Sequence, residues 1–208
     1  MIELFYWSSP NGRKISIMLE ELNVEYKITT INISKREQFK IKFKKLSPAS
    51  KIPAIIDHQN GNCIFESCAI LIYLANKYNK FMPKKKYWEI LQWLIYQSSQ
   101  VGPYLGQAHQ FLYYHPGKSS YAEKKYINYA KKIYKTLNKR LERRKFLVDN
   151  YSIADIATWP WIARYERQGV NLKNYKNLLK WYKLIGKRKA VIEGYNPLNE
   201  KEKIPLIN

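Results

Sequence analysis

The sequence predicts a small α/β domain over residues 1–83 followed by an all-helical domain over residues 84–208. Three observations support this division. Apolar runs of strand length alternate with turn residues in the first part of the chain, and such runs vanish after Tyr87. Between the two parts, Phe81-Met82-Pro83 and three lysines have the composition of a linker. A chain of 208 residues is long enough for two such domains.

The α/β part begins with a βαβ unit. Residues 2–7 predict a strand, residues 13–22 a helix and residues 26–31 a second strand, so the two strands should pair in parallel. Residues 32–46 are polar and lysine-rich, with two phenylalanines four positions apart. This spacing favours one short helix with a thin apolar stripe and with Gln38 at its start.

A proline opens the next strand. Proline cannot donate within a central ladder, so Pro53 must be the first residue of its strand or lie on a sheet edge. Such a corner favours a cis peptide, which would expose the backbone of Ile52 as a docking edge. The turn 59–62 then predicts a hairpin, and residues 63–65 form its returning strand.

Two strand-to-helix junctions are candidates for an anion site. Ser9-Pro10-Asn11-Gly12 follows the first strand, and a helix N-terminus there would suit an anion or an incipient thiolate. The alternative is an ordinary loop with good turn chemistry. Glu66 and Ser67 precede a second helical pattern, where Ser67 is expected to be a helix cap, a seat for a ligand carboxylate, or both, because the two roles use the same free N–H groups.

The second part of the chain reads as helices. Ser152 and Asp155 form a capping box, which we interpret as structural. Trp93, Trp159 and Trp161 are expected in the core. Helical periodicity covers residues 87–113, 121–143, 153–167 and 174–188.

The composition excludes several function classes. The net charge of +21 would permit binding to nucleic acid or an anionic membrane, but the lysines are scattered along both halves instead of forming one basic face. No apolar run is long enough to span a membrane, and no signal peptide is visible, so a cytoplasmic protein is expected. Cys63 and Cys68 are expected to be thiols, and the three histidines lack neighbouring ligands, so no metal is assigned.

These motifs, in this order along the whole chain, resemble the cytosolic glutathione transferase superfamily. They are most similar to the bacterial nu-class proteins, homologues that act as disulfide-bond oxidoreductases. The resemblance implies a thioredoxin-like N-terminal domain, glutathione as cosubstrate and a homodimer. The segments that carry it include Ser9-Pro10-Asn11-Gly12, Lys51-Ile52-Pro53-Ala54-Ile55, Phe65-Glu66-Ser67, Gly102-Pro103-Tyr104-Leu105-Gly106-Gln107 and Tyr151-Ser152-Ile153-Ala154-Asp155.

The resemblance also implies roles for matching positions. Ser9 would place its hydroxyl near the glutathione sulfur, with Asn11 as the neighbouring amide. Lys132 stands where relatives carry arginine, so a point charge would replace a bidentate fork. The remaining implied glutathione contacts are Gln38 on the glycyl side or on a second glutathione, Lys51, the backbone of Ile52 before Pro53 at the cysteinyl part, and Glu66 with Ser67 at the γ-glutamyl end.

A thioredoxin fold normally carries a Cys-Pro-x-Cys turn where this chain has Ser9-Pro10-Asn11-Gly12, so the sulfur must come from glutathione. Donors at Ser9 and Asn11 would favour its thiolate, which attacks a small disulfide through a mixed disulfide. The alternatives are a transferase that conjugates electrophiles and a non-catalytic binding or dimerisation module. Three further roles stay open against simple packing: Tyr6 as thiolate donor, Cys68 as a redox thiol, and Tyr104, Gln107 and Phe111 as the lining of an electrophile site.

Overall fold

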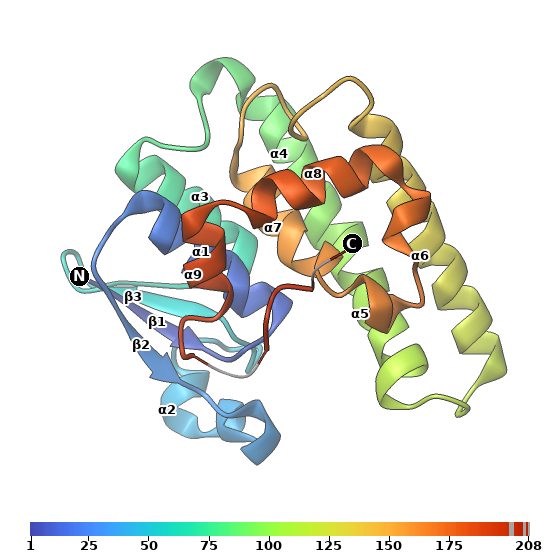
Figure 1. Cartoon of the computed structure of the whole chain (residues 1–208). Helices are drawn as coiled ribbons and strands as arrows, with labels where there is room; N and C mark the ends of the chain where they lie inside the picture. The colour runs from blue at the N-terminus through green and yellow to red at the C-terminus, as the bar shows by residue number, and fades with distance from the viewer. Residues whose placement is uncertain (200–201, 206, 208) are drawn as a thin grey trace. The chain divides into compact units, whose positions relative to one another are not determined.

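The computed structural model describes residues 1–199, 202–205 and 207. The chain forms two compact units (Figure 1). The first contains Met1–Met82 together with the later segment Lys189–Lys203, and the second contains Pro83–Arg188 with Ile204–Asn208. The first unit therefore recruits a segment from near the far end of the chain.

The first unit is built on a four-stranded mixed sheet with the order β2-β1-β3-β4. The strands β1 and β2 are parallel, as the βαβ pattern predicts, whereas β3 is antiparallel to both β1 and β4. The alternation of apolar residues buries Leu4 and Ile55, which face each other in the register of β1 and β3. The strands are β1 Ile2–Tyr6, β2 Tyr26–Thr30, β3 Ala54–Asp57 and β4 Asn62–Phe65.

Three helices lie on one side of this sheet, and α2 lies on the other (Figure 1). The helix α1 packs against both α3 and α9. Gly194 of α9 approaches the backbone of Ile17 so closely that no Cβ would fit. Arg13 of α1 also donates from Nε to the carbonyl oxygen of Tyr195, at 2.8 Å. The helices of this unit are α1 Pro10–Leu22, α2 Ile41–Lys44, α3 Ser67–Tyr78 and α9 Lys189–Tyr195.

The single short helix expected over residues 32–46 is wrong. This segment forms two 3-10 turns and a four-residue helix instead, because Arg36 has a φ of 59° and Lys40 is extended with a ψ of 140°. Only half of the expected apolar stripe packs: the ring of Phe43 lies 6.1 Å from that of Phe5, whereas Phe39 is 46% exposed. The pieces are Ile33–Lys35, Glu37–Phe39 and α2.

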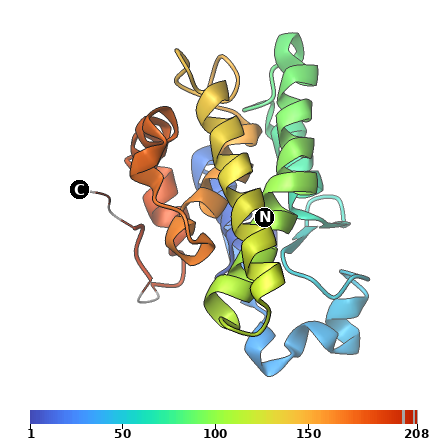
Figure 2. The same cartoon turned by 90° about the vertical axis from the view of Figure 1, so that its right-hand side faces the viewer.

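The second unit is helical, as predicted, with the long helix α6 coloured yellow in Figure 2. The capping box is confirmed: Asp155 accepts hydrogen bonds from Ser152 N and from Leu147 N at 3.1 and 2.9 Å. Trp159 and Trp161 are buried, whereas Trp93 is only half-buried. The α-helices are α4 Tyr87–Tyr96, α5 Gly102–His109, α6 Ser120–Arg140, α7 Ile153–Ile162 and α8 Lys176–Gly186. Shorter helical turns are Lys84–Lys86, Gln97–Val101, Gln110–Tyr114, Tyr165–Gln168 and Leu172–Asn174.

Candidate functional site

The first junction of interest lies where β1 ends and α1 begins. Ser9 is the N-cap residue: it is extended, and its Oγ accepts a hydrogen bond from Gly12 N at 3.1 Å. Pro10 takes the first helical position, where its missing N–H costs nothing, so the helix starts earlier than the apolar pattern alone predicted. Because Oγ accepts in this bond, the Ser9 hydroxyl can donate its proton to a group outside the helix. Asn11 follows in the same turn and is half-buried.

The pairing of the strands brings three of the predicted segments to the same end of the sheet. Phe5 near the end of β1 pairs with Ala54, and Ala54 pairs with Phe65 at the end of β4. The turn after β1, the residues before β3 and the residues after β4 therefore share the same end of the sheet. The helices α1 and α3 also begin at this end of the sheet. The free backbone N–H groups of their first turns are available to bind an anion.

The residues before β3 have the predicted backbone. The Ile52–Pro53 peptide is cis, which confirms the expectation. Ser47 holds the preceding residue, since its Oγ donates to the carbonyl oxygen of Lys51 at 2.8 Å and accepts from Lys51 N at 3.3 Å. Pro53 is buried, Ile52 is half-buried and the side chain of Lys51 is exposed.

The junction between β4 and α3 differs from the expected cap. Glu66, not Ser67, occupies the N-cap position, and its side chain makes no capping bond. Its backbone has a φ of 67° and a ψ of 113°, a strained conformation for a residue with a side chain. Glu66 is exposed, whereas Ser67 is buried as the first residue of α3. Strain of this kind concentrates at functional sites, because surrounding structure must enforce it.

A buried lysine completes this end of the sheet. Lys14 is 2% exposed, and its Nζ donates to Ser67 Oγ at 3.1 Å. Burial lowers the pKa of Lys14 to about 8, although Cys68 and Glu66 oppose the shift. The sequence reasoning assigned Lys14 no role. A signal was present, however: Arg13 is a cation in the first turn of α1, where the macrodipole disfavours positive charge, and Lys14 follows it directly.

Comparison with known proteins places this geometry in a family. Residues 2–76 match the family model "Glutathione S-transferase, N-terminal domain", and residues 102–188 match "Glutathione S-transferase, C-terminal domain". This chain belongs to the glutathione S-transferase family. The predicted fold, a thioredoxin-like domain followed by a helical domain, is thereby confirmed.

Two similar relatives are named as disulfide-bond oxidoreductases. The chain is 40% identical over 198 residues to Disulfide-bond oxidoreductase YfcG of Escherichia coli (strain K12), covering 91% of this chain and 92% of that protein. It is 36% identical to Disulfide-bond oxidoreductase YghU of the same organism, over 96% of this chain and 78% of the relative.

Solved structures of the family resemble this one closely. A glutathione transferase from Pseudomonas putida, with one glutathione disulfide bound per subunit, has a TM-score of 0.90 and 32% identity, covering 95% of this chain and 92% of that one. A glutathione transferase from Burkholderia graminis, with two glutathione molecules bound per subunit, has a TM-score of 0.89 and 32% identity, covering 95% and 88%.

Two of the predicted glutathione contacts, Gln38 and Lys132, lie on other elements of the chain. Gln38 lies on the 3-10 turn Glu37–Phe39, with its amide oxygen buried and without a hydrogen-bond partner among the described residues. Lys132 lies exposed on α6 of the helical unit. Their roles stay predictions.

The side chains with alternative roles are also placed. Tyr6 is fully buried, as packing in the strand predicts. Cys63 and Cys68 are thiols, as expected, the first exposed and the second half-buried. In the helical unit, Tyr104 stacks on Tyr129 with ring centroids 4.3 Å apart. Packing thus accounts for Tyr6 and Tyr104, while the role of Cys68 stays open.

The two other candidates for an electrophile site have different surroundings. Phe111 stacks on Tyr126 at 5.5 Å, and Gln107 is exposed on α5. Among the described residues, no group of three or more His, Cys, Asp or Glu side chains is arranged to hold a metal ion, and no helix is long and apolar enough to cross a membrane.

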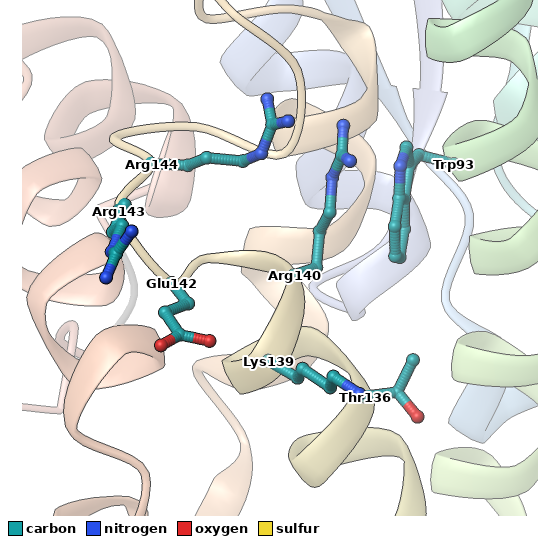
Figure 3. Close-up of a pocket in the computed structure, with 7 residues that line it drawn as sticks. All are labelled: Trp93, Thr136, Lys139, Arg140, Glu142, Arg143 and Arg144. Atoms are coloured by element: carbon teal, nitrogen blue, oxygen red, sulfur yellow. The ribbon is translucent and has the colours of Figure 1, made fainter.

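A separate pocket of about 660 Å³ lies in the helical unit (Figure 3). Arg140 lies over the ring of Trp93 and forms an ion pair with Glu89. Arg144 pairs with Asp149 at 3.4 Å. Arg140 therefore joins α6 to α4, and Arg144 closes the loop that follows α6, so both arginines have structural contacts. Its lining residues are Trp93, Thr136, Lys139, Arg140, Glu142, Arg143 and Arg144.

Proposed function

We propose that the chain is a glutathione-dependent disulfide-bond oxidoreductase that reduces small disulfides. The observation that carries the proposal is the turn that caps α1: a hydroxyl and an amide, Ser9 and Asn11, stand at a helix N-terminus, at the same end of the sheet as the cis-proline Pro53, with no cysteine in the turn. A site of this kind can stabilise a thiolate but has none of its own. The two relatives named as disulfide-bond oxidoreductases support this assignment. Within the family, we place the chain in the bacterial nu class.

Glutathione is proposed to lie along the end of the sheet that these segments share. Its cysteinyl part would bond to the backbone of Ile52 before the cis-proline, and its γ-glutamyl end would meet the N-terminus of α3. The sulfur would then lie near the N-terminus of α1. The residues we assign to glutathione are Ser9 and Asn11 at the sulfur, and Gln38, Lys51, Ile52, Pro53, Glu66, Ser67 and Lys132 along the rest of the tripeptide.

The proposed reaction proceeds by thiol–disulfide exchange. Ser9 and Asn11 lower the pKa of the bound thiol by donating to its anion, since a hydrogen bond to the charged form favours that form. The glutathione thiolate attacks one sulfur of the substrate disulfide, and the other sulfur leaves as a thiolate that takes up the proton. A second glutathione thiolate attacks the mixed disulfide, releasing the second product thiol and leaving glutathione disulfide. The bound states of the two solved relatives, two glutathione molecules or one glutathione disulfide, match the two ends of this sequence.

The experiment that tests the proposal compares two activities on the same protein. Glutathione-driven reduction of a small disulfide is measured beside conjugation of chlorodinitrobenzene, for wild type, Ser9→Ala, Asn11→Ala and Cys68→Ala. We expect reduction to dominate and Asn11→Ala to impair it more than Cys68→Ala does. Dominant conjugation would make the chain a transferase, and unimpaired Ser9→Ala and Asn11→Ala variants would place the chemistry elsewhere.

Two further parts of the proposal concern the surroundings of the enzyme. A homodimer is proposed from the resemblance to the family, and light scattering of the purified protein tests it. The cytoplasm is the proposed compartment, because the reaction consumes reduced glutathione and cytosolic glutathione pools are kept strongly reducing.

A further inference from the structure

Lys14 has no explanation in the local stability of α1. Lys14 is the fifth residue of α1, and the first turn of this helix contains no acidic residue. The side chain is 2% exposed, so its ammonium has lost most of its hydration, which is costly for a charge. A charge that is buried at this cost is expected to serve a group that it contacts.

One group that Lys14 contacts is the hydroxyl of Ser67, the first residue of α3. An ammonium can only donate hydrogen bonds, so in the 3.1 Å contact the Ser67 Oγ is the acceptor. The hydroxyl proton is therefore directed to another acceptor. The Ser67 hydroxyl lies at the N-terminus of the twelve-residue helix α3, directly after the strained and exposed Glu66. This is the end of the sheet where the candidate site lies.

We infer that Lys14 is a positioning residue, which sets the Ser67 hydroxyl to donate to the α-carboxylate of the γ-glutamyl group. The inference rests on the proposed function, since it concerns how the same site recognises glutathione. The buried charge adds to the positive end of α3, so this subsite selects a carboxylate over a neutral group. Lys14 itself touches Ser67, and it acts on the ligand through that hydroxyl.

The arrangement makes carboxylate binding depend on pH. Among the described residues, two titratable groups that act on the Lys14 ammonium are Cys68 on α3 and Glu66 directly before α3, and both favour the charged form. On α9, the other helix packed against α1, Glu193 acts on Tyr26 and Tyr195 stacks on Arg13. Burial outweighs the favourable groups and lowers the pKa of Lys14 to about 8. A neutral Lys14 amine can accept a proton from Ser67, which then no longer donates to the ligand.

The test measures binding of S-methylglutathione, whose sulfur cannot titrate, by calorimetry at pH 7 and pH 9. Lys14→Met removes the charge and the donors at similar length. The matched control is Lys44→Met, which removes the same charge from an exposed position on α2. Lys14→Arg restores a permanent charge, and Cys68→Ala removes the nearby titrating thiol. A second ligand carries an amide in place of the γ-glutamyl carboxylate.

At pH 7 we expect Lys14→Met to weaken S-methylglutathione binding about ten-fold or more, the usual range for a hydrogen bond to a charged group. Lys44→Met should change it less than about two-fold, and the amide ligand should not distinguish wild type from Lys14→Met. Between pH 7 and pH 9, wild type should lose up to about ten-fold in affinity relative to Lys14→Met, since most Lys14 becomes neutral. Titration of the ligand's own amine cancels in this ratio. Cys68→Ala should keep the pH dependence, and Lys14→Arg should retain affinity at pH 9.

Each failure has a distinct meaning. If wild type binds neither ligand at millimolar concentration, the proposed function fails. If wild type binds S-methylglutathione but Lys14→Met behaves like Lys44→Met, or the ratio is the same at both pH values, the inference about Lys14 is overturned. Methionine is unbranched, similar in length to lysine and adaptable in apolar surroundings, so Lys14→Met is expected to fold. Should it not fold, the pH dependence of wild type and Cys68→Ala for the two ligands still decides the question.

Discussion

Ser9 has two tasks in this structure, and substitutions can separate them. Its Oγ caps α1 by accepting from Gly12 N at 3.1 Å, and its hydroxyl proton is proposed to stabilise the glutathione thiolate. Ser9→Ala removes both the cap and the donor. Ser9→Gly removes the donor but leaves a residue that is tolerated at an N-cap, and Ser9→Thr retains both.

The two tasks have different magnitudes. Loss of the cap bond should cost Ser9→Ala about 1 kcal/mol, and Ser9→Gly only a few tenths of this. For a chain of this size, about 1 kcal/mol lowers the melting temperature by about 2–4 °C. Loss of one hydrogen bond to the thiolate is worth about 1.5–3 kcal/mol, which raises the pKa of the bound thiol by about one to two units.

The assay is the pH–rate profile for glutathione-driven reduction of a small disulfide, with a thermal melt of each variant. Ser9→Ala and Ser9→Gly should shift the rising limb of the profile by about one to two pH units and lower the rate at pH 7 about ten- to hundred-fold. Ser9→Thr should resemble wild type. If Ser9→Gly keeps the wild-type profile while Ser9→Ala loses only stability, Ser9 is a cap alone and the proposed thiolate donor must be another group.

Three further predictions concern stability. His109 is buried and accepts at Nε2 from Gln168, and burial together with nearby arginines lowers its pKa to about 4 from 6.5. As the pH falls, the imidazole takes up a proton in the unfolded state before it does so in the folded state. The free energy of unfolding of wild type should therefore fall by about 3 kcal/mol between pH 6.5 and 4 because of this group. Denaturant titrations of His109→Gln should lack this part of the pH dependence. Asp155→Ala leaves several buried donors without an acceptor and should cost about 3 kcal/mol or more in the same titrations. Arg13→Met removes the donor to Tyr195 O and should speed hydrogen exchange in α9 at least ten-fold.

Controls make these stability predictions decisive. Lys44→Met changes the same formal charge as Arg13→Met at an exposed position, so it should leave exchange in α9 unchanged. A Ser119→Ala variant loses an ordinary cap on α6 and should cost only about 1 kcal/mol, well below Asp155→Ala. Equal losses in this pair, unchanged exchange in Arg13→Met, or parallel pH profiles for wild type and His109→Gln would each contradict the corresponding argument.

The sequence by itself determined those features that depend on neighbouring residues. Pro53 at the start of a strand with a cis peptide, the hairpin around the turn 59–62, and the box of Ser152 and Asp155 all follow from residues within a few positions of each other. Such features are readable because hydroxyl caps, fixed proline φ values and short turns are local effects. The family resemblance rests on the same local motifs, in their order along the chain.

Only the tertiary structure decided the long-range contacts. The bond between Lys14 and Ser67 joins residues 53 apart, and the return of α9 to α1 joins Arg13 to Tyr195, 182 apart. The helix predicted over residues 32–46 is interrupted at Arg36 and Lys40, and of its two phenylalanines Phe43 packs on Phe5 of the sheet while Phe39 is exposed. Local sequence records what a residue favours, but which distant group meets it is decided by how helices and sheet bury their apolar faces together. The cation that we infer to orient Ser67 could therefore be recognised only once the chain was folded.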